Sequence, residues 1–105
     1  MKIKILNKNY SLLYTLRGFF IFESLAKRPY KPGLLTDDYI LLYAILLASN
    51  QESFDMDFDK FIAECDKDAS IFKTFAGWFL KEMKKRIIFN DEGTETAGAK
   101  KKNSP

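Results

Sequence analysis

Residues 15–26 read Thr-Leu-Arg-Gly-Phe-Phe-Ile-Phe-Glu-Ser-Leu-Ala, and their apolar side chains spread around a helix instead of forming one stripe. Leu16 and Phe19 follow helical spacing on one side, whereas Phe22 and Leu25 occupy much of the rest. A helix that is apolar nearly all round is buried on more than one side, either by its own domain or by a partner. This stretch therefore predicts a central helix or a helix at an interface.

A second segment, residues 39–48, is also apolar on nearly every side. It follows a Thr-Asp-Asp sequence at residues 36–38, in which the threonine predicts an N-cap and the two acids favour the positive end of a helix dipole. We expect a helix over 37–49, packed against the first one with an edge groove between them. Gly18 costs a helix about 1 kcal/mol relative to alanine, which suggests that it allows a neighbouring backbone to come close.

Shorter patterns predict the other elements. Asn7-Lys8-Asn9 separates two alternating segments and predicts the turn of a β-hairpin. Thr15, Asp57 and Asp68 each stand where a helix N-cap belongs. The predicted elements are strands at 2–6 and 10–14, and helices from 16 to about 27, 37–49, 58–66 and from 69 to about 88.

Together these elements define an α+β fold that is mainly helical, with an N-terminal β-hairpin, about four helices and a disordered C-terminal tail. We expect one globular domain over residues 1–89, because 105 residues suffice for a single modest core. Residues 90–105 carry charged and small side chains without apolar periodicity and predict a disordered tail.

The composition argues against catalysis. The chain contains no histidine, which removes Ser-His and Cys-His nucleophile pairs and the commonest general base. Cys65 is the sole cysteine, and its place in a helical pattern predicts a buried, inert thiol. We therefore expect a protein that is not an enzyme and needs no cofactor.

One motif resembles a metal site. Asp55, Asp57 and Asp59 match the beginning of a calcium-binding loop, but the sixth position is Lys60 instead of glycine and the twelfth is Asp66 instead of glutamate. Helix capping by Asp57 accounts for the pattern better, so we expect no metal.

Charge is distributed unevenly along the chain. Residues 1–35 hold seven basic residues and one acidic residue, whereas residues 36–68 hold two basic and nine acidic residues. This division favours self-complementarity, within or between subunits, over nucleic-acid binding. The basic residues at 81–86, near Trp78, are explained by the preference of cations for the C-terminal end of a helix.

The sequence does not predict membrane association. Its longest apolar run, residues 39–48, is ten residues, whereas a membrane-spanning helix needs about 20. The first residues alternate charged and apolar side chains, without the continuous apolar core of a signal peptide. We expect a soluble, cytoplasmic protein.

Aromatic residues are the candidates for partner binding. Two helices with little polar surface leave an interface as an alternative to a purely internal core. The residues that we expect to bind a partner are Phe19, Phe22, Tyr39, Tyr43 and Trp78.

The predicted elements follow a recognisable order. The hairpin leads directly into Tyr-Thr-Leu-Arg at residues 14–17, and after a proline-rich break Thr-Asp-Asp-Tyr at 36–39 begins an aliphatic helix. A short helix beginning Phe-Asp-Lys-Phe-Ile at 58–62 and a longer one after Asp68 continue it. This order resembles the small tail assembly chaperones of tailed phages and prophages. The resemblance implies a protein of the bacterial host cytoplasm, often acting in several copies, that binds the long helical tape measure protein and keeps it soluble while the tail tube polymerises.

Two other functions remain open. The chain is alternatively a homo-oligomeric structural or adaptor protein of a phage-like particle, or a small nucleic-acid-binding regulator. The resemblance also implies, for several family members, a second form made by a −1 ribosomal frameshift. Lys101-Lys102-Asn103 lies where such a signal is expected, although it also fits a simple solubilising tail.

Overall fold

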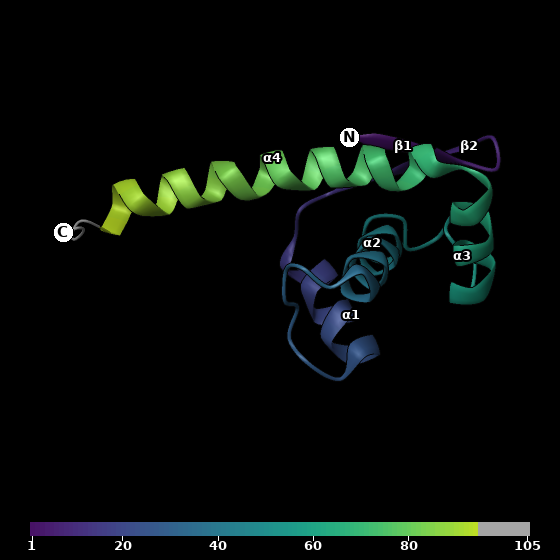
Figure 1. Cartoon of the computed structure of the whole chain (residues 1–105), viewed down its shortest axis with the longest axis horizontal. Coiled ribbons are helices and arrows are strands. Elements are labelled where there is room, and N and C mark those ends of the chain that lie inside the picture. The colour runs from purple at the N-terminus through teal and green to yellow at the C-terminus, as the bar shows by residue number, and fades with distance from the viewer. Residues whose placement is uncertain (95–105) are drawn as a thin grey trace.

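The computed structural model describes the backbone of residues 1–94 and the side chains of residues 1–86. It consists of a two-stranded antiparallel hairpin followed by four helices, which confirms the predicted fold class (Figure 1). The elements are β1 (Lys2–Ile5), β2 (Lys8–Ser11), α1 (Leu16–Ala26), α2 (Leu35–Ser49), α3 (Phe58–Lys67) and α4 (Ala69–Thr94).

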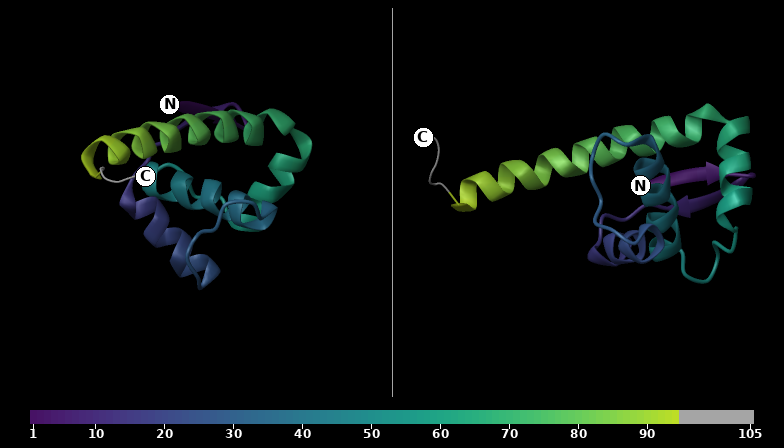
Figure 2. Two further views of the ribbon diagram at one scale, coloured as in Figure 1. Left: turned by 60° about the vertical axis from the view of Figure 1, so that its left-hand side comes forward. Right: turned by 60° about the horizontal axis from the view of Figure 1, so that its bottom comes forward.

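The helices surround α2. Helix α1 packs along α2, and α4 crosses the pair with the hairpin beside it, while α3 stands at the N-terminal end of α4 (Figures 1 and 2). The 26 residues of α4 span about 39 Å, and its C-terminal part projects beyond the body of the molecule in every view. As a result, only part of α4 is covered by the rest of the chain.

The hairpin is confirmed, but its turn lies earlier than predicted. Leu6 and Asn7 both have left-handed φ values, 52° and 64°, which form the two-residue loop that matches strand twist. Asn9 was expected in the turn, yet it pairs with Lys4 inside the ladder. The second strand is therefore 8–11 instead of 10–14, because a leucine adopts a backbone conformation that the sequence pattern assigned to asparagine.

Side chains at the C-terminal end of α2 hydrogen-bond to the backbone of the hairpin and of the residues that follow it. The Asn50 side chain accepts a hydrogen bond from the Ser11 backbone N–H at 2.8 Å and donates one to the Ser11 carbonyl at 2.9 Å. Its amide thereby satisfies both backbone groups of a strand residue. Ser49 Oγ accepts a further bond from the Leu13 N–H at 3.0 Å.

Helix α1 begins and ends as predicted. The Thr15 hydroxyl accepts a hydrogen bond from the Gly18 N–H at 3.3 Å, and Lys27 ends the helix in a left-handed conformation. A Cβ added to Gly18 would lie 3.1 Å from Ile45 Cγ1. The glycine therefore allows α2 to come close, which confirms the interpretation drawn from its position.

Helix α2 starts differently from the prediction. Leu34 occupies the cap position without a side-chain hydrogen bond, and Thr36 lies inside the first turn, so the predicted threonine cap is wrong. The earlier start places Asp37 at the third helical position, where its side chain faces inward and pairs with Arg28. From Leu41 to Leu46 every side chain of α2 is buried, so this helix is the central one, as expected.

Asp57 and Asp68 cap α3 and α4 as predicted. Asp57 Oδ1 accepts from the Lys60 N–H at 2.8 Å, and Asp68 Oδ1 accepts from the Ser70 N–H at 3.0 Å. Helix α4 continues to Thr94, beyond its predicted end near residue 88. Residues 95–105 lie outside the described part of the chain, so most of the predicted tail, with Lys101 to Asn103, stays a prediction.

The core lies where the hairpin, α2 and α4 meet. It combines the inward side chains of alternating hairpin positions, the middle of α2 and one row of α4 with buried residues of α1 and α3. Its buried apolar residues are Ile3, Ile5, Tyr10, Leu12, Phe22, Leu41, Leu42, Tyr43, Ala44, Ile45, Leu46, Phe54, Phe61, Cys65, Ile71, Phe75 and Phe79.

Candidate protein-binding grooves

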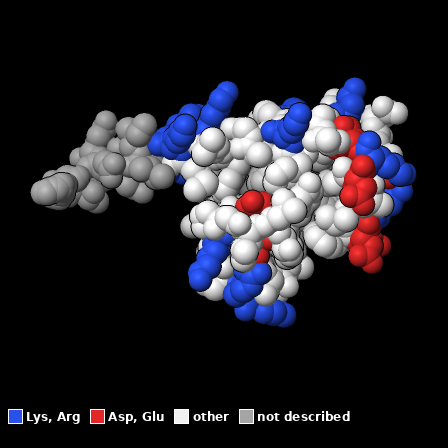
Figure 3. Space-filling view, viewed as in Figure 1, with Lys and Arg blue, Asp and Glu red and all other residues white. Residues whose placement is uncertain are grey.

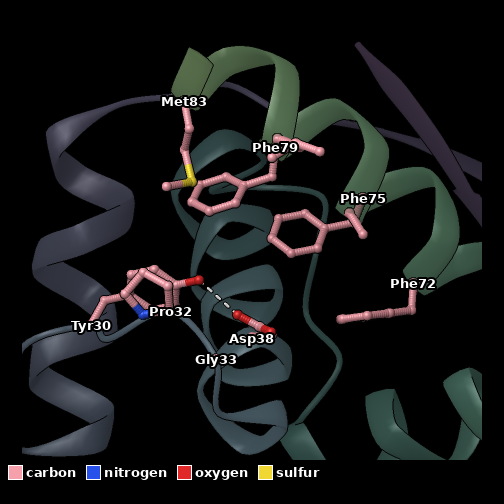
Figure 4. Close-up of a pocket in the computed structure, with 10 residues that line it drawn as sticks. Tyr30, Pro32, Gly33, Asp38, Phe72, Phe75, Phe79 and Met83 are labelled. Carbon is pink, nitrogen blue, oxygen red and sulfur yellow. Dashed lines mark hydrogen bonds between the residues drawn. The ribbon is translucent and has the colours of Figure 1, made fainter. Parts of the chain in front are cut away.

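An apolar groove runs beneath α4, and we name it the α4 groove. It lies between α4, the beginning of α2 and the connecting residues 27–34, and it has a volume of about 330 Å³. The aromatic side chains of α4 point toward the connecting loop across this space (Figure 4). Its lining residues are Tyr30, Pro32, Gly33, Asp38, Phe72, Phe75, Ala76, Phe79, Leu80 and Met83.

The loop wall of this groove is held by polar contacts at the start of α2. Arg28 donates from both terminal nitrogens to the two carboxylate oxygens of Asp37, whose side chain is fully buried. This pairing holds the pKa of Asp37 below its usual range, and a backbone hydrogen bond from Lys31 lowers it further. The loop is therefore anchored as a wall with one defined position.

Tyr30 fixes the middle of the same wall. Burial raises the pKa of its phenol, and so does its hydrogen bond, because the hydroxyl donates to Asp38 Oδ1 at 2.7 Å. The ring packs edge-on against Phe22 and Phe79, with centroid distances of 5.5 and 5.9 Å. Tyr30 thus joins the loop to α1, α2 and α4.

A second apolar depression lies over α2, between α1 and α3, and we name it the α2 groove. It consists of a hollow of about 240 Å³ and an adjoining one of about 380 Å³, and both are lined by Phe58. Its lining residues are Leu25, Leu35, Thr36, Tyr39, Ile40, Tyr43, Phe58, Ile62, Cys65 and Asp66. The sequence predicted an edge groove between the first two long helices, and the structure adds α3 as its third wall.

A pair of stacked rings separates the two grooves. Tyr39 lines the α2 groove and Phe72 lines the α4 groove, and their rings stack with centroids 4.3 Å apart at an angle of 18°. Both side chains are only half-buried. Apolar surface therefore continues from one groove to the other across the Tyr39–Phe72 stack.

The predicted partner-binding residues divide between these places. Tyr39 and Tyr43 both line the α2 groove, with Tyr43 only 8% exposed on its floor, where its hydroxyl donates to the Met56 carbonyl at 2.7 Å. Phe22 has no exposed surface and belongs to the core, so it offers nothing to a partner in this conformation. Phe22 lies on the face of α1 that packs against α2, one turn after Gly18, so it is a core residue and not the partner-binding residue that the sequence predicted.

Phe19 and Trp78 line neither groove. Phe19 is half-buried, with its ring 5.4 Å from that of Tyr14 and 6.4 Å from that of Phe79. Trp78 is half-buried beside Phe75 on α4. Both support the aromatic core near the grooves and do not form their surface.

The apolar residues of α4 recur at steps of three and four and form a wide stripe, part of which lines the α4 groove. Phe72, Ala76, Leu80 and Met83 belong to the apolar stripe of α4, but Ala76 and Leu80 are exposed. A neighbouring row, Ile71, Phe75 and Phe79, is the one that the body covers. The sequence feature that indicates this exposed surface is the width of the apolar stripe of α4, which exceeds what one buried helix face requires.

A third apolar surface lies on the outer side of α1. Leu16 and Phe20 lie one turn apart on α1 and are 72% and 63% exposed, and Leu13, just before the helix, is 50% exposed; we name these three residues the α1 ridge. Arg17 and Ser24 border a shallow hollow beside Phe20. Large apolar side chains gathered this way mark interaction surfaces in soluble proteins.

Several titratable groups are buried or paired within the described residues. Burial, together with nearby acidic residues, raises the pKa of the Cys65 thiol to about 11, so the thiolate nucleophile is scarce at neutral pH. Lys85 and Arg86 both pair with Glu82, and the Arg86 guanidinium lies 3.9 Å from the centre of the Tyr14 ring. Within the described residues, no three His, Cys, Asp or Glu side chains gather as metal ligands.

Charges are unevenly distributed over the surface. On the face shown in Figure 3, acidic side chains gather mainly at the α3 end, where basic side chains lie among them, whereas basic side chains alone lie around the lower end of α1 and along α4. The surface between them is largely uncharged (Figure 3).

No protein-family model matches the chain, and neither a curated protein nor a solved structure is significantly similar to it. None of the described helices combines the length and apolar character needed to cross a membrane.

Proposed function

We propose that this protein is a non-enzymatic tail assembly chaperone of a tailed phage or prophage, acting in the bacterial cytoplasm. Its client would be a hydrophobic helical protein, and the tape measure protein is the candidate that the family resemblance supplies. The proposal rests on two apolar grooves that meet at the Tyr39–Phe72 stack. Grooves lined by aromatic and aliphatic side chains are the usual receptors for amphipathic helices.

The order of elements adds support. The hairpin that leads into Thr15, the proline-rich connection before α2, and the short α3 followed by the long α4 are the features on which the resemblance rests. Each groove is built at one of these junctions, since the connection 27–34 walls the α4 groove and α3 walls the α2 groove. The parts that define the resemblance are thus also the parts that create apolar surface.

Co-expression tests the proposal directly. The long helical protein encoded nearby is produced with and without this chain, and the soluble fraction of that protein is measured. We expect its solubility to depend on the chain. Equal solubility in both cases would contradict the chaperone function.

The α1 ridge favours a second function, that of a homo-oligomeric structural or adaptor protein. Leu16 and Phe20 are too exposed to contribute much to the core, and a copy of the same surface could cover them. Light scattering of the purified chain separates the two functions. A stable oligomer that dissociates on Phe20→Glu substitution, without any effect on client solubility, would favour the structural role.

A further inference from the structure

We infer that the α4 groove binds one amphipathic client helix, about three turns long, through apolar anchors and one lysine or arginine that faces Asp38. This inference rests on the proposed function and assigns it a particular site and a particular ligand chemistry. It follows from the length, the openness and the charge of the groove.

The length of the groove sets the length of the ligand. Its α4 wall runs from Phe72 to Met83, a distance of about 16 Å along the helix axis. A client helix lying alongside would present three or four anchors at i, i+3 or i+4, and i+7. Phenylalanine rings and the flexible thioether of Met83 adapt to anchors of different shape.

Two small residues keep the groove open. Ala76 is exposed at the middle of the α4 wall, and Gly33 stands in the loop wall with a φ of 103°. No heavy atom lies within 4 Å of a Cβ built on Gly33. Anchors of a client could therefore enter where larger residues would fill the space.

A single carboxylate decides the charge of the ligand. Asp38 is the one acidic or basic residue that lines the α4 groove, and Tyr30 holds its Oδ1 in place. Among the ion pairs of the described residues, Asp38 has none. Because its surroundings are apolar and half-buried, its attraction for a cation is screened less than that of a surface carboxylate.

The other charges near the α4 groove have a weaker electrostatic effect on a bound helix. Helical spacing places Lys73 one turn before Ala76 and Lys84 one turn after Leu80, but both lysines are exposed and therefore screened by salt. Asp66 at the edge of the α2 groove is exposed as well, which is why the α4 groove makes the stronger case for a charge-specific site.

The test uses two synthetic 18-residue helical peptides with leucine anchors at heptad spacing. They differ at one position beside the central anchor, which is lysine in one peptide and glutamate in the other. Binding of fluorescein-labelled peptide to the full chain is measured by anisotropy. We expect the lysine peptide to bind about threefold to tenfold more tightly than the glutamate peptide.

Matched variants locate the site. Ala76→Leu fills the groove and should weaken binding of the lysine peptide about tenfold or more. Gly77→Leu places the same side chain one residue further along α4, in open space, and should leave binding unchanged. Asp38→Asn keeps an acceptor for Tyr30 but removes the charge, so it should abolish the preference for lysine over glutamate.

The outcomes separate this inference from the function on which it rests. Equal binding by Ala76→Leu and Gly77→Leu, or no lysine preference in the wild-type chain, overturns the inference, even if the chain still keeps the tape measure protein soluble. If the variant contrast holds while client solubility does not depend on the chain, the groove assignment stands and the chaperone function falls. Circular dichroism melting of each variant confirms that the fold is intact.

Discussion

At the scale of single residues, Asp37 is the side chain whose role differs most from its pattern in the sequence. It was expected as a first-turn acid that interacts with the helix dipole, yet it is fully buried and held by both terminal nitrogens of Arg28. The paired carboxylate anchors the loop that walls the α4 groove. Nothing in a linear sequence indicates that a residue nine positions earlier will meet it.

This ion pair predicts acid sensitivity. The folded pKa of Asp37 lies below the unfolded value of about 3.9, so the unfolded chain takes up the proton more readily. Stability contributed by the pair is present above about pH 4 and is lost as the pH falls through the folded pKa. Urea unfolding of wild type and Asp37→Asn at pH 7 and pH 3 should show a smaller pH dependence for the variant.

Asp55→Asn serves as the control, because Asp55 is exposed and makes no hydrogen bond or ion pair with the described residues. It should retain the pH dependence of wild type. An Asp37→Asn variant that loses stability on acidification as steeply as wild type would contradict the assigned role.

Two phenylalanines of α1 offer a second residue-scale prediction. Phe22 is completely buried, so Phe22→Ala should lower the free energy of unfolding by about 3–5 kcal/mol. Phe20 is 63% exposed, and Phe20→Ala should change it by no more than about 0.5 kcal/mol. Denaturant melts of the two variants test whether the Phe22 side of α1 is core and the Phe20 side is surface.

At the scale of elements, two glycines inside helices have different reasons to be there. Gly77 of α4 faces open space, so Gly77→Ala should raise the free energy of unfolding by about 0.5–1 kcal/mol through helix propensity. In α1, Gly18→Ala should fall short of that gain, because its Cβ would press on Ile45. Equal gains in thermal or urea melts would mean that α1 and α2 are not packed this closely.

The joint between the hairpin and α2 supplies the next prediction. Asn50→Ala removes the partner of both Ser11 backbone groups, and leaving part-buried groups unpaired costs about 1–3 kcal/mol. Besides this loss in unfolding free energy, hydrogen exchange at the Ser11 amide should accelerate. Gln51→Ala, next to it in an exposed position, should leave both measurements unchanged.

The elements themselves could largely be predicted, and the exceptions have physical causes. Alternation, capping residues and apolar spacing are local signals, which is why Thr15, Asp57 and Asp68 were placed correctly as caps. The position of the turn was predicted wrongly, because the strand register overrides the conformational preference of a single residue and places Leu6 in the turn. The grooves depend on which half of a wide apolar stripe is covered, and that is decided by packing between elements far apart in the sequence.

At the scale of the whole molecule, the projecting part of α4 makes the fold elongated. The radius of gyration is 15.8 Å, whereas a compact chain of this length has a value of about 13 Å. Small-angle X-ray scattering of a monomer should therefore show the extended profile of Figure 1 at every concentration. A radius that rises with concentration would instead favour the homo-oligomeric alternative.

The Tyr39–Phe72 stack has a consequence for how tightly a client is held and how fast it leaves. Each groove alone is small, so each would give a weak and short-lived complex. A client whose segments occupied both sides of the stack would bind the second one at a high effective concentration and gain avidity. Loss of either segment would return the complex to weak binding. Under the proposed chaperone function, a tail tube growing over the client would then displace it one segment at a time.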